Sequence, residues 1–266
     1  MTVRRLALAA LALAAALPAA AQSTRPVRMV VPSVPGGGTD LTWRLIEPRL
    51  GEALGHKLVI DNRGGGGGDV GATIVAHAPP DGLTLLAGVS SVTINPAFKK
   101  DMPYDVLRDL APVSLAAKAP NILVSHPSVP AKSVAELIAW IKAQPRPPQY
   151  ASAGIGSMPH LMMALFLDLT RLQLAHVAYK GTAQASLDVL SGQVPLMVGN
   201  VLPTLPLIAG GRLRAYGVTG ATRSAAAPDI PTLAEAGVAG YDAVQWFGLW
   251  APAKTPPATI ARLHAA

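Results

Sequence analysis

The residues best suited to chemistry are the glycines Gly36–Gly38, which follow a predicted strand at Val27–Val31 and precede Thr39 and Asp40. Residues without side chains leave backbone N–H groups uncovered, and the start of a helix carries partial positive charge. Thr39 or Asp40 can cap that helix, and Asp40 can also orient the loop or bind a ligand hydroxyl. The stretch predicts a main-chain cradle for a carboxylate or phosphate, with a tight turn that holds no ligand as the alternative.

Three later turns offer further donors at the points where strands lead into helices. Ala153–Ser157 precedes a proline, and Ser157 at the cap predicts another helix start rich in N–H groups. Lys180, in the turn Tyr179–Thr182, could neutralise a second carboxylate or lie in solvent. Asn200 follows another strand and is a further candidate.

Two stretches in the first hundred residues could complete the polar lining. Gly64–Gly68 opens a formal G-x-G-x-x-G dinucleotide fingerprint. Five successive glycines make a chance match easy, so we interpret this stretch as a loop, with ligand contact and no contact both open. The polar stretch Ser90–Pro96 is predicted to be a loop that offers the hydroxyls of Ser90, Ser91 and Thr93.

No set of catalytic residues emerges from the sequence. The rival function is an exported α/β hydrolase that uses Ser157 and His160, but no acid partner has a recognisable context and no G-x-S-x-G motif is present. The chain has no cysteine, and its six histidines show no paired spacing typical of metal ligands. A structural hydrogen bond is the simpler role for His160. We therefore expect no enzyme activity, no cofactor and no metal.

Composition and charge narrow the class of protein further. The 266 residues are 50% hydrophobic and 14% charged, which allows a sizeable core. Lysine and arginine number 22 against 15 aspartate and glutamate residues, and the bases are scattered rather than clustered. This pattern argues against a nucleic-acid face and gives only a weak long-range attraction for anions.

The N-terminus has the pattern of a secretory signal. Arg4 and Arg5 precede an apolar run to Leu17, and Pro18 is followed by alanines to Ala21. We predict a signal peptide of residues 1–21, cleaved after Ala21, and export to the periplasm. A transmembrane anchor is the alternative, but the apolar run is shorter than the ~20 residues usual for a span.

Strands and helices alternate along most of the chain. Strands are predicted at 27–31, 57–61, 83–87, 121–125, 149–152, 174–179, 194–198 and 213–218. Helices are predicted at 39–54, near 70–77 and at 159–169, and Pro48 should kink or shorten the first of them. Further helices are predicted to begin at Ser133 and Pro257, to end at Leu190 and at Ala209, and to form one short stretch after Thr232. This order predicts two mostly parallel α/β sheets flanked by helices, with glycine-bearing loops at the strand ends that bind ligands.

A series of motifs resembles the Bug-type solute receptors of tripartite tricarboxylate transporters. They are VRMVVPSVPGGGTD, VIDNRGGGGGDVGA, PDGLTLL, PYD with DLAPVSL, SVPAKSVAELI, YASAGIGSMPHL, VAYKGTAQASLDVLSGQVPLM and DIPTLAEAG. The resemblance covers Val27 to Pro252. It implies a two-lobed, Venus-flytrap receptor of the periplasmic-binding-protein type (type II-like), which captures a small carboxylate such as a di- or tricarboxylate, amino acid or aromatic acid. It also implies a monomer that delivers its ligand to integral-membrane permease subunits made by other chains, without chemistry on the ligand.

Two features depart from the family pattern. Family members usually continue beyond Ala266 with helices that complete the first lobe, so a truncated copy without function is an alternative interpretation. The family also commonly has aspartate where this chain has Gly199, which bears on ligand identity.

The motifs and the resemblance together define the expected organisation. Lobe one is expected from residues 22–120 and 219–266 and lobe two from 121–218, with the hinge near Lys118–Asn121 and Val218–Ala221. Trp246 and Phe247 are expected in the core near the crossing. The candidate ligand-binding residues are Gly36, Gly37, Gly38, Thr39, Asp40, Ser90, Ser91, Gly156, Ser157, His160, Tyr179, Lys180, Gly181 and Asn200.

Overall fold

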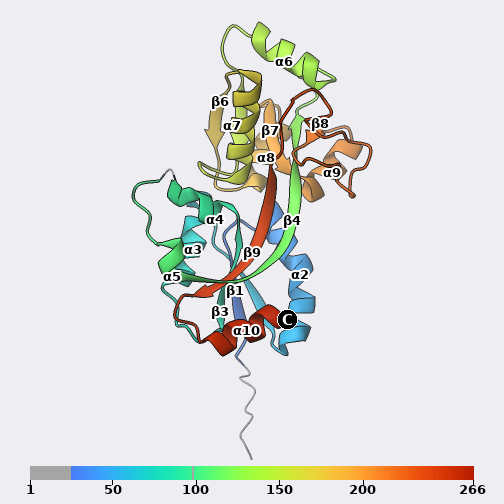
Figure 1. Ribbon diagram of the computed structural model, residues 1–266. Coiled ribbons are helices and arrows are strands. Elements are labelled where there is room, and N and C mark those ends of the chain that lie inside the picture. The colour runs from blue at the N-terminus through green and yellow to red at the C-terminus, as the bar shows by residue number, and fades with distance from the viewer. Residues whose placement is uncertain (1–24, 98) are drawn as a thin grey trace, which may run out of the picture.

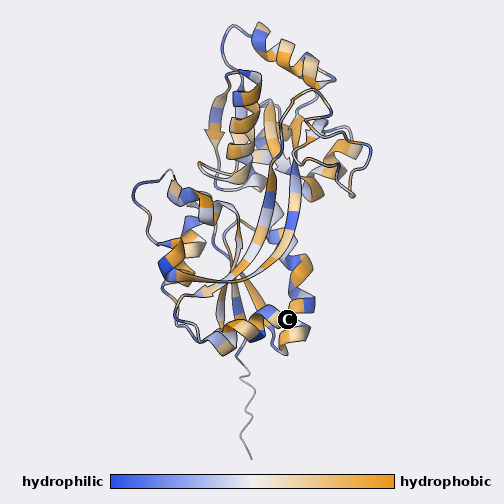
Figure 2. Cartoon of the chain, in the orientation of Figure 1, coloured by the Kyte–Doolittle hydropathy of each residue, from blue (hydrophilic) through white to orange (hydrophobic). Residues whose placement is uncertain are grey.

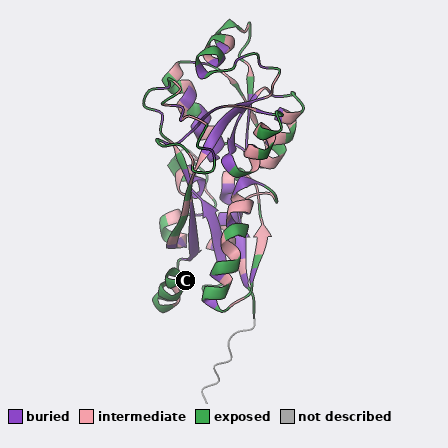
Figure 3. Ribbon diagram, turned by 90° about the vertical axis from the view of Figure 1, so that its right-hand side faces the viewer, coloured by how far each residue is buried: buried purple, intermediate pink, exposed green. Residues whose placement is uncertain are grey.

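Two lobes joined by two long strands make up the described part of the chain, residues 25–97 and 99–266 of this computed structural model (Figure 1). The predicted signal peptide lies outside these residues. Each lobe is a sheet with helices on both faces, as the sequence predicts. Figure 3 shows the buried residues concentrated in the two sheets and on the inner sides of the helices.

The sheet of the first lobe combines parallel and antiparallel strands. Its order is β2 (Leu58–Asn62), β1 (Val27–Val31), β3 (Thr84–Val89), β9 (Val244–Pro252) and β4 (Leu110–Ser125). β1 pairs in parallel with β2 and β3, whereas β9 is antiparallel to both β3 and β4. β1 is apolar on both faces because helices cover both: Val27, Met29 and Val31 face one core and Val30 the other.

The helices of the first lobe divide between those two cores. α2 (Gly38–Leu54) and α10 (Pro257–Ala265) cover one face, where Trp43 and Leu263 are buried. The other face carries α3 (Asp69–Ala76) and the short helices η1 (Gly66–Gly68), α4 (Ser91–Ile94), η2 (Asn95–Ala97) and α5 (Val106–Asp109). Ala72 and Val75 of α3 pack there against Trp250 of β9.

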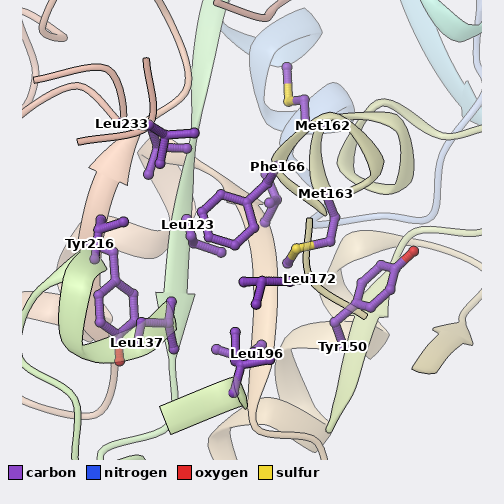
Figure 4. Close-up of a cluster of buried hydrophobic side chains, with 14 of the residues drawn as sticks. Leu123, Leu137, Tyr150, Met162, Met163, Phe166, Leu172, Leu196, Tyr216 and Leu233 are labelled. Atoms are coloured by element: carbon purple, nitrogen blue, oxygen red, sulfur yellow. The ribbon is translucent and has the colours of Figure 1, made fainter. Parts of the chain in front are cut away.

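The second lobe is built around the far end of β4. Its strands are β7 (Leu196–Asn200), β5 (Gln149–Ser152) and β6 (Ala175–Ala178) on one side of β4, and β8 (Arg214–Val218) on the other. α6 (Val134–Ala143) and α7 (Met158–Thr170) cover one face, and α8 (Thr182–Leu190) and α9 (Val201–Ala209) cover the opposite face. Figure 4 shows the core under α7, where Phe166 lies among Leu123, Leu172 and Leu196.

β4 changes partner where it passes from one lobe to the other. It pairs with β9 up to Pro120 and with β7 from Asn121 onward. The segment after β8 does not return to the first lobe at once, because Leu233, Val238 and Tyr241 are buried in the core of the second lobe. The chain crosses back only with β9.

Most elements agree with the sequence-based predictions, and the differences have local causes. The predicted loop at 90–96 is wrong, because Ser91–Ile94 and Asn95–Ala97 are short helices. Pro48 does not shorten α2, which ends at Gly55 in the left-handed conformation (φ 65°). Thr232 and Glu235 make both predicted capping hydrogen bonds, but they close a turn rather than a helix.

The strands β4 (before Asn121) and β9 were not predicted as strands. Pro112 and Pro120 interrupt the pattern of β4, and prolines argue against an interior strand. Phe247 is buried in the core as predicted, whereas Trp246 is half-buried. Figure 2 shows helices that carry both apolar and polar residues. Within the described ranges, none is both long and apolar enough to span a membrane.

Truncation of Phe166 tests the importance of the second lobe's core. Phe166 is 1% exposed, so Phe166→Ala should cost about 3–5 kcal/mol of the free energy of unfolding, measured by urea denaturation followed by circular dichroism. Leu187→Ala, at a side chain 66% exposed on α8, should change it by less than about 0.5 kcal/mol. Equal effects of the two substitutions would contradict this assignment of the core.

Candidate functional site

A small cavity lies between the lobes, at the ends of strands from both sheets. Its volume is about 50 Å³. The first lobe contributes Pro32, Ser33, Gly37, Gly38, Thr39, Gly65, Gly67, Gly68, Val89, Ser91 and Gln245. The second lobe contributes Ala153, Ser157, Met158, Pro159, Lys180, Gly181, Thr182 and Asn200. Glycine, hydroxyl and amide residues thus predominate in the lining.

Five helices begin at this cavity, and none has its first turn capped by a side chain. They are α2, α3, α7, α8 and α9, with N-cap residues Gly37, Gly68, Ser157, Gly181 and Asn200. By contrast, α5 and α6 begin away from the cavity and are capped by Asp105 and Ser133. The N–H groups in a first turn have no partner within the helix. Their concentration here makes the cavity a region of positive potential with free donors.

Asp40 shapes the first glycine loop from behind instead of capping α2. Its carboxylate accepts hydrogen bonds from Gly36 N at 2.9 Å and from Asn62 Nδ2 at 2.8 Å, and it pairs with Arg44. Burial alone would raise the pKa of Asp40, but these hydrogen bonds and the charge of Arg44 outweigh it and lower the pKa. The predicted capping role is therefore wrong, and the alternative role, orienting the loop, is confirmed.

A second network holds the glycine run that precedes α3. Ser91 Oγ donates to Gly67 O at 2.6 Å, and Asn95 Nδ2 donates to Asp69 Oδ1 at 2.7 Å. Lys99 pairs with the other oxygen of Asp69. Gly67 has φ +70°, a conformation that favours glycine, so the backbone conformation explains why glycine occurs at this position.

The loop Ala153–Ser157 of the second lobe is held by its own hydrogen bonds. Ser157 Oγ donates to Gly154 O at 2.7 Å, and it accepts no capping hydrogen bond from the first turn of α7. His160 Nδ1 accepts a hydrogen bond from Gly156 N at 3.2 Å. Ser157 and His160 are not hydrogen-bonded to each other, so the pair lacks the contact between nucleophile and base that a hydrolase needs. This confirms the structural role expected for His160.

The lobes touch across the cavity at glycines. The pairs that approach are Gly38 with Asn200, Gly67 with Ile155, and Gly181 with Val34. A Cβ atom placed on Gly38 would lie 2.0 Å from Asn200 Cγ, and one on Gly67 would lie 2.7 Å from Ile155 O. Real Cβ atoms do not approach other atoms so closely, so glycine at these positions permits the lobes to come together.

The structure brings eight of the fourteen predicted ligand residues to the cavity wall. These are Gly37, Gly38, Thr39, Ser91, Ser157, Lys180, Gly181 and Asn200. The other six, Gly36, Asp40, Ser90, Gly156, His160 and Tyr179, are not part of the wall. Tyr179 OH donates to Asp188 of α8, and Ser90 is fully buried at the start of α4.

Several lining residues were not among the predicted set. Gly65, Gly67 and Gly68 belong to the glycine run for which the sequence left ligand contact open. No feature of the sequence marked Gln245 as a candidate, because it lies on β9, a strand that was not predicted. Lys180 is the one charged residue on the described wall, and no carboxylate belongs to it.

Comparisons with known proteins agree with this geometry. A family model described as "Tripartite tricarboxylate transporter family receptor" matches residues 42–266. The structure of Rpa4515 from R. palustris with adipate is 39% identical, with a TM-score of 0.86 over 91% of this chain and 81% of that one. The periplasmic binding protein BugD is 34% identical, with a TM-score of 0.85 over 90% and 80%. MatC from Rhodopseudomonas palustris with bound malate is 33% identical, with a TM-score of 0.84 over 91% and 83%.

The substitution Asp40→Asn tests how the first glycine loop is held. The amide keeps the size of the side chain but loses the charge that faces Arg44 and an acceptor for buried donors. We expect a loss of about 1–3 kcal/mol in the free energy of unfolding at pH 7, measured by urea denaturation. Asp168→Asn is the control, because the side chain of Asp168 is 67% exposed and the change should cost less than about 0.5 kcal/mol.

The same pair of variants predicts a pH dependence. Since the pKa of Asp40 is lower in the folded state, its contribution is complete above the ordinary value of 3.8 and is lost as the pH falls below it. The stability difference between wild type and Asp40→Asn should therefore shrink in that range. A difference that is constant down to acid pH would contradict the assigned hydrogen bonds.

Proposed function

The chain belongs to the family of tripartite tricarboxylate transporter receptors and is a solute-binding receptor, and we propose that its ligand is a small organic dicarboxylate held between the lobes. The observation that carries the proposal is the group of five helix starts without side-chain caps at one cavity. Relatives with bound adipate and malate support the ligand class.

Neutral main-chain donors suit a receptor that must also release its ligand. A carboxylate accepts several N–H hydrogen bonds and gains from the dipoles of the helices behind them. Donors come from α2 and α3 in the first lobe and from α7, α8 and α9 in the second. A ligand that contacts both lobes therefore favours the closed state, and it loses the donors of one lobe when the lobes part. The presence of Lys180 in the cavity wall supports a contact with a second carboxylate.

We propose a division into lobes that follows the packing of the chain. Lobe one comprises residues 25–120 and 244–266, and lobe two comprises 121–243. The sequence placed the return at residue 219, but Leu233 and Tyr241 pack in the core of the second lobe, which favours a return at Val244. The hinge then consists of β4 near Asn121 and β9 near Val244.

The setting follows from family membership and likeness. We propose a periplasmic receptor, exported by a signal peptide cleaved after Ala21, that acts as a monomer and passes its ligand to integral-membrane permease subunits. Its likeness to the periplasmic binding protein BugD supports this compartment. A hydrolase receives no support, because Ser157 and His160 are each bonded to backbone groups of their own loop.

Calorimetric titration with a charged ligand and its neutral analogue tests the ligand class. Adipate or malate should bind with measurable heat and raise the melting temperature. Adipamide has the same chain length as adipate but no charge, and should bind at least roughly tenfold more weakly, equivalent to about 1.4 kcal/mol. Binding of adipamide as tight as that of adipate would contradict a site built for anions.

A substitution at Gly38 tests the closure of the lobes. Gly38 is not in the left-handed region, so Gly38→Ala introduces no backbone strain. Because the lobes of the free protein can part and so avoid the contact with Asn200, the melting temperature of the free protein should change little. Affinity for the bound dicarboxylate should fall roughly tenfold, because the new Cβ meets Asn200.

Asn200→Gly provides the matched second change, since it removes the three atoms that lie nearest to the new Cβ. The loss caused by Gly38→Ala should be clearly smaller in the Asn200→Gly background than in the wild type. An equal loss in both backgrounds would show that the Gly38–Asn200 approach is not part of the bound state.

A further inference from the structure

Two stacked histidines lie behind the wall of the cavity. His160, in the first turn of α7, stacks on His176 of β6 with ring centroids 4.3 Å apart and planes at 10°. Tyr150 of β5 also stacks on His176, at 4.8 Å. Neither histidine belongs to the cavity wall, so the pair has no direct part in the ligand contacts described above.

Each ring supports the loop that forms the wall. His160 Nδ1 accepts the hydrogen bond of Gly156 N at 3.2 Å. His176 Nε2 is bonded to Ser152 Oγ at 2.6 Å, and that oxygen also accepts from Gly154 N at 3.1 Å. Gly154 and Gly156 of the loop Ala153–Ser157 are therefore each linked to an imidazole, in addition to the hydrogen bonds from Ser157 that hold the loop.

The position of this loop affects both the contacts to the ligand and the closure of the lobes. Ala153 and Ser157 line the cavity, and the loop leads into the free N–H groups at the start of α7. Ile155 O lies where the first lobe meets the second, against Gly67. A displaced loop would therefore misplace donors and also hinder closure.

We propose that His160 and His176 are positioning residues that make ligand affinity fall in acid, because protonation of His160 removes the acceptor for the Gly156 amide. This inference rests on the proposed function, since it assumes that the wall of the cavity holds an anion. It assigns the histidines a role through the loop, not in contact with the ligand.

The chemistry of imidazole gives the direction of the effect. A neutral ring has one accepting nitrogen, whereas a protonated ring donates from both, so His160⁺ would face Gly156 N with a second proton. Two charged rings at 4.3 Å would also repel each other. Burial lowers the pKa of His160, and burial together with the charge of His160 lowers the pKa of His176 to about 4.

The neighbouring groups do not favour the protonated form of either histidine. From β5, Tyr150 stays neutral, because burial raises its pKa to about 12, and Ser152 carries no charge. Among the described residues, no carboxylate, lysine or arginine is hydrogen-bonded or ion-paired to either ring. Since both folded-state pKa values lie below the ordinary 6.5, the rings are neutral above pH 6.5 and gain protons only as the pH falls below it, which sets the direction in which the Gly156 acceptor is lost.

Calorimetric titration with adipate from pH 8 to pH 5 tests the proposal with three variants. In His160→Asn, the amide oxygen can replace Nδ1 as an acceptor that does not titrate. In His160→Leu, the acceptor is lost at every pH. His126→Asn is the control for removing a titrating histidine, because His126 is only partly buried, is bonded to Ser128 and does not line the cavity.

Affinity should fall roughly threefold more over this range in wild type and His126→Asn than in His160→Asn. Titration of adipate itself contributes equally to all of them. His160→Leu should bind weakly, and its affinity should change with pH as little as that of His160→Asn. Equal slopes in wild type and His160→Asn, or affinity that rises in acid, would overturn the proposal.

Nuclear magnetic resonance of the free protein separates this inference from the proposed ligand. The Gly156 amide resonance should shift with the titration of His160 in wild type and stay constant in His160→Asn. If adipate fails to bind but this coupling is seen, the ligand class is wrong and the positioning role stands. A Gly156 resonance that ignores the state of His160 would overturn the positioning role.

Discussion

The account depends on one physical constraint: N–H groups at helix starts are left without side-chain partners where they face a shared cavity. Away from the cavity, α5 and α6 satisfy the same groups with Asp105 and Ser133, although α10, whose N-cap residue is Pro256, has no side-chain cap. At the cavity the N-caps are residues whose side chains are missing or engaged elsewhere, such as Gly37 and Ser157. The two sheets, linked only through β4 and β9, bring these helix starts face to face (Figure 1).

Much of the fold could be predicted because its strands are buried on both faces and therefore appear as apolar runs. β1 and β3 are examples, and the helices between them begin and end at glycines or capping residues. The long strands β4 and β9 could not be recognised in the same way. Prolines interrupt β4, and β9 gains its place through pairing with β3 and β4, which is a tertiary property.

The site was predictable where it depends on backbone and less so where it depends on side chains. Glycines that follow strands marked the cavity, since only a close approach or a positive φ explains so many together. Asp40 and His160 were predicted to bind the ligand, but they lie outside the cavity wall and hold the loops through Gly36 N and Gly156 N. Gln245 could not be found from its type alone, because its position depends on β9.

A crystal structure of the protein with adipate would test the central claim most directly. We expect the carboxylate oxygens within hydrogen-bond distance of backbone N–H groups in the first turns of α2 and of at least one helix of the second lobe. Gly38 should remain against Asn200 in that complex. A ligand bound outside this cavity, or one whose charge is met only by lysine or arginine side chains, would contradict the account.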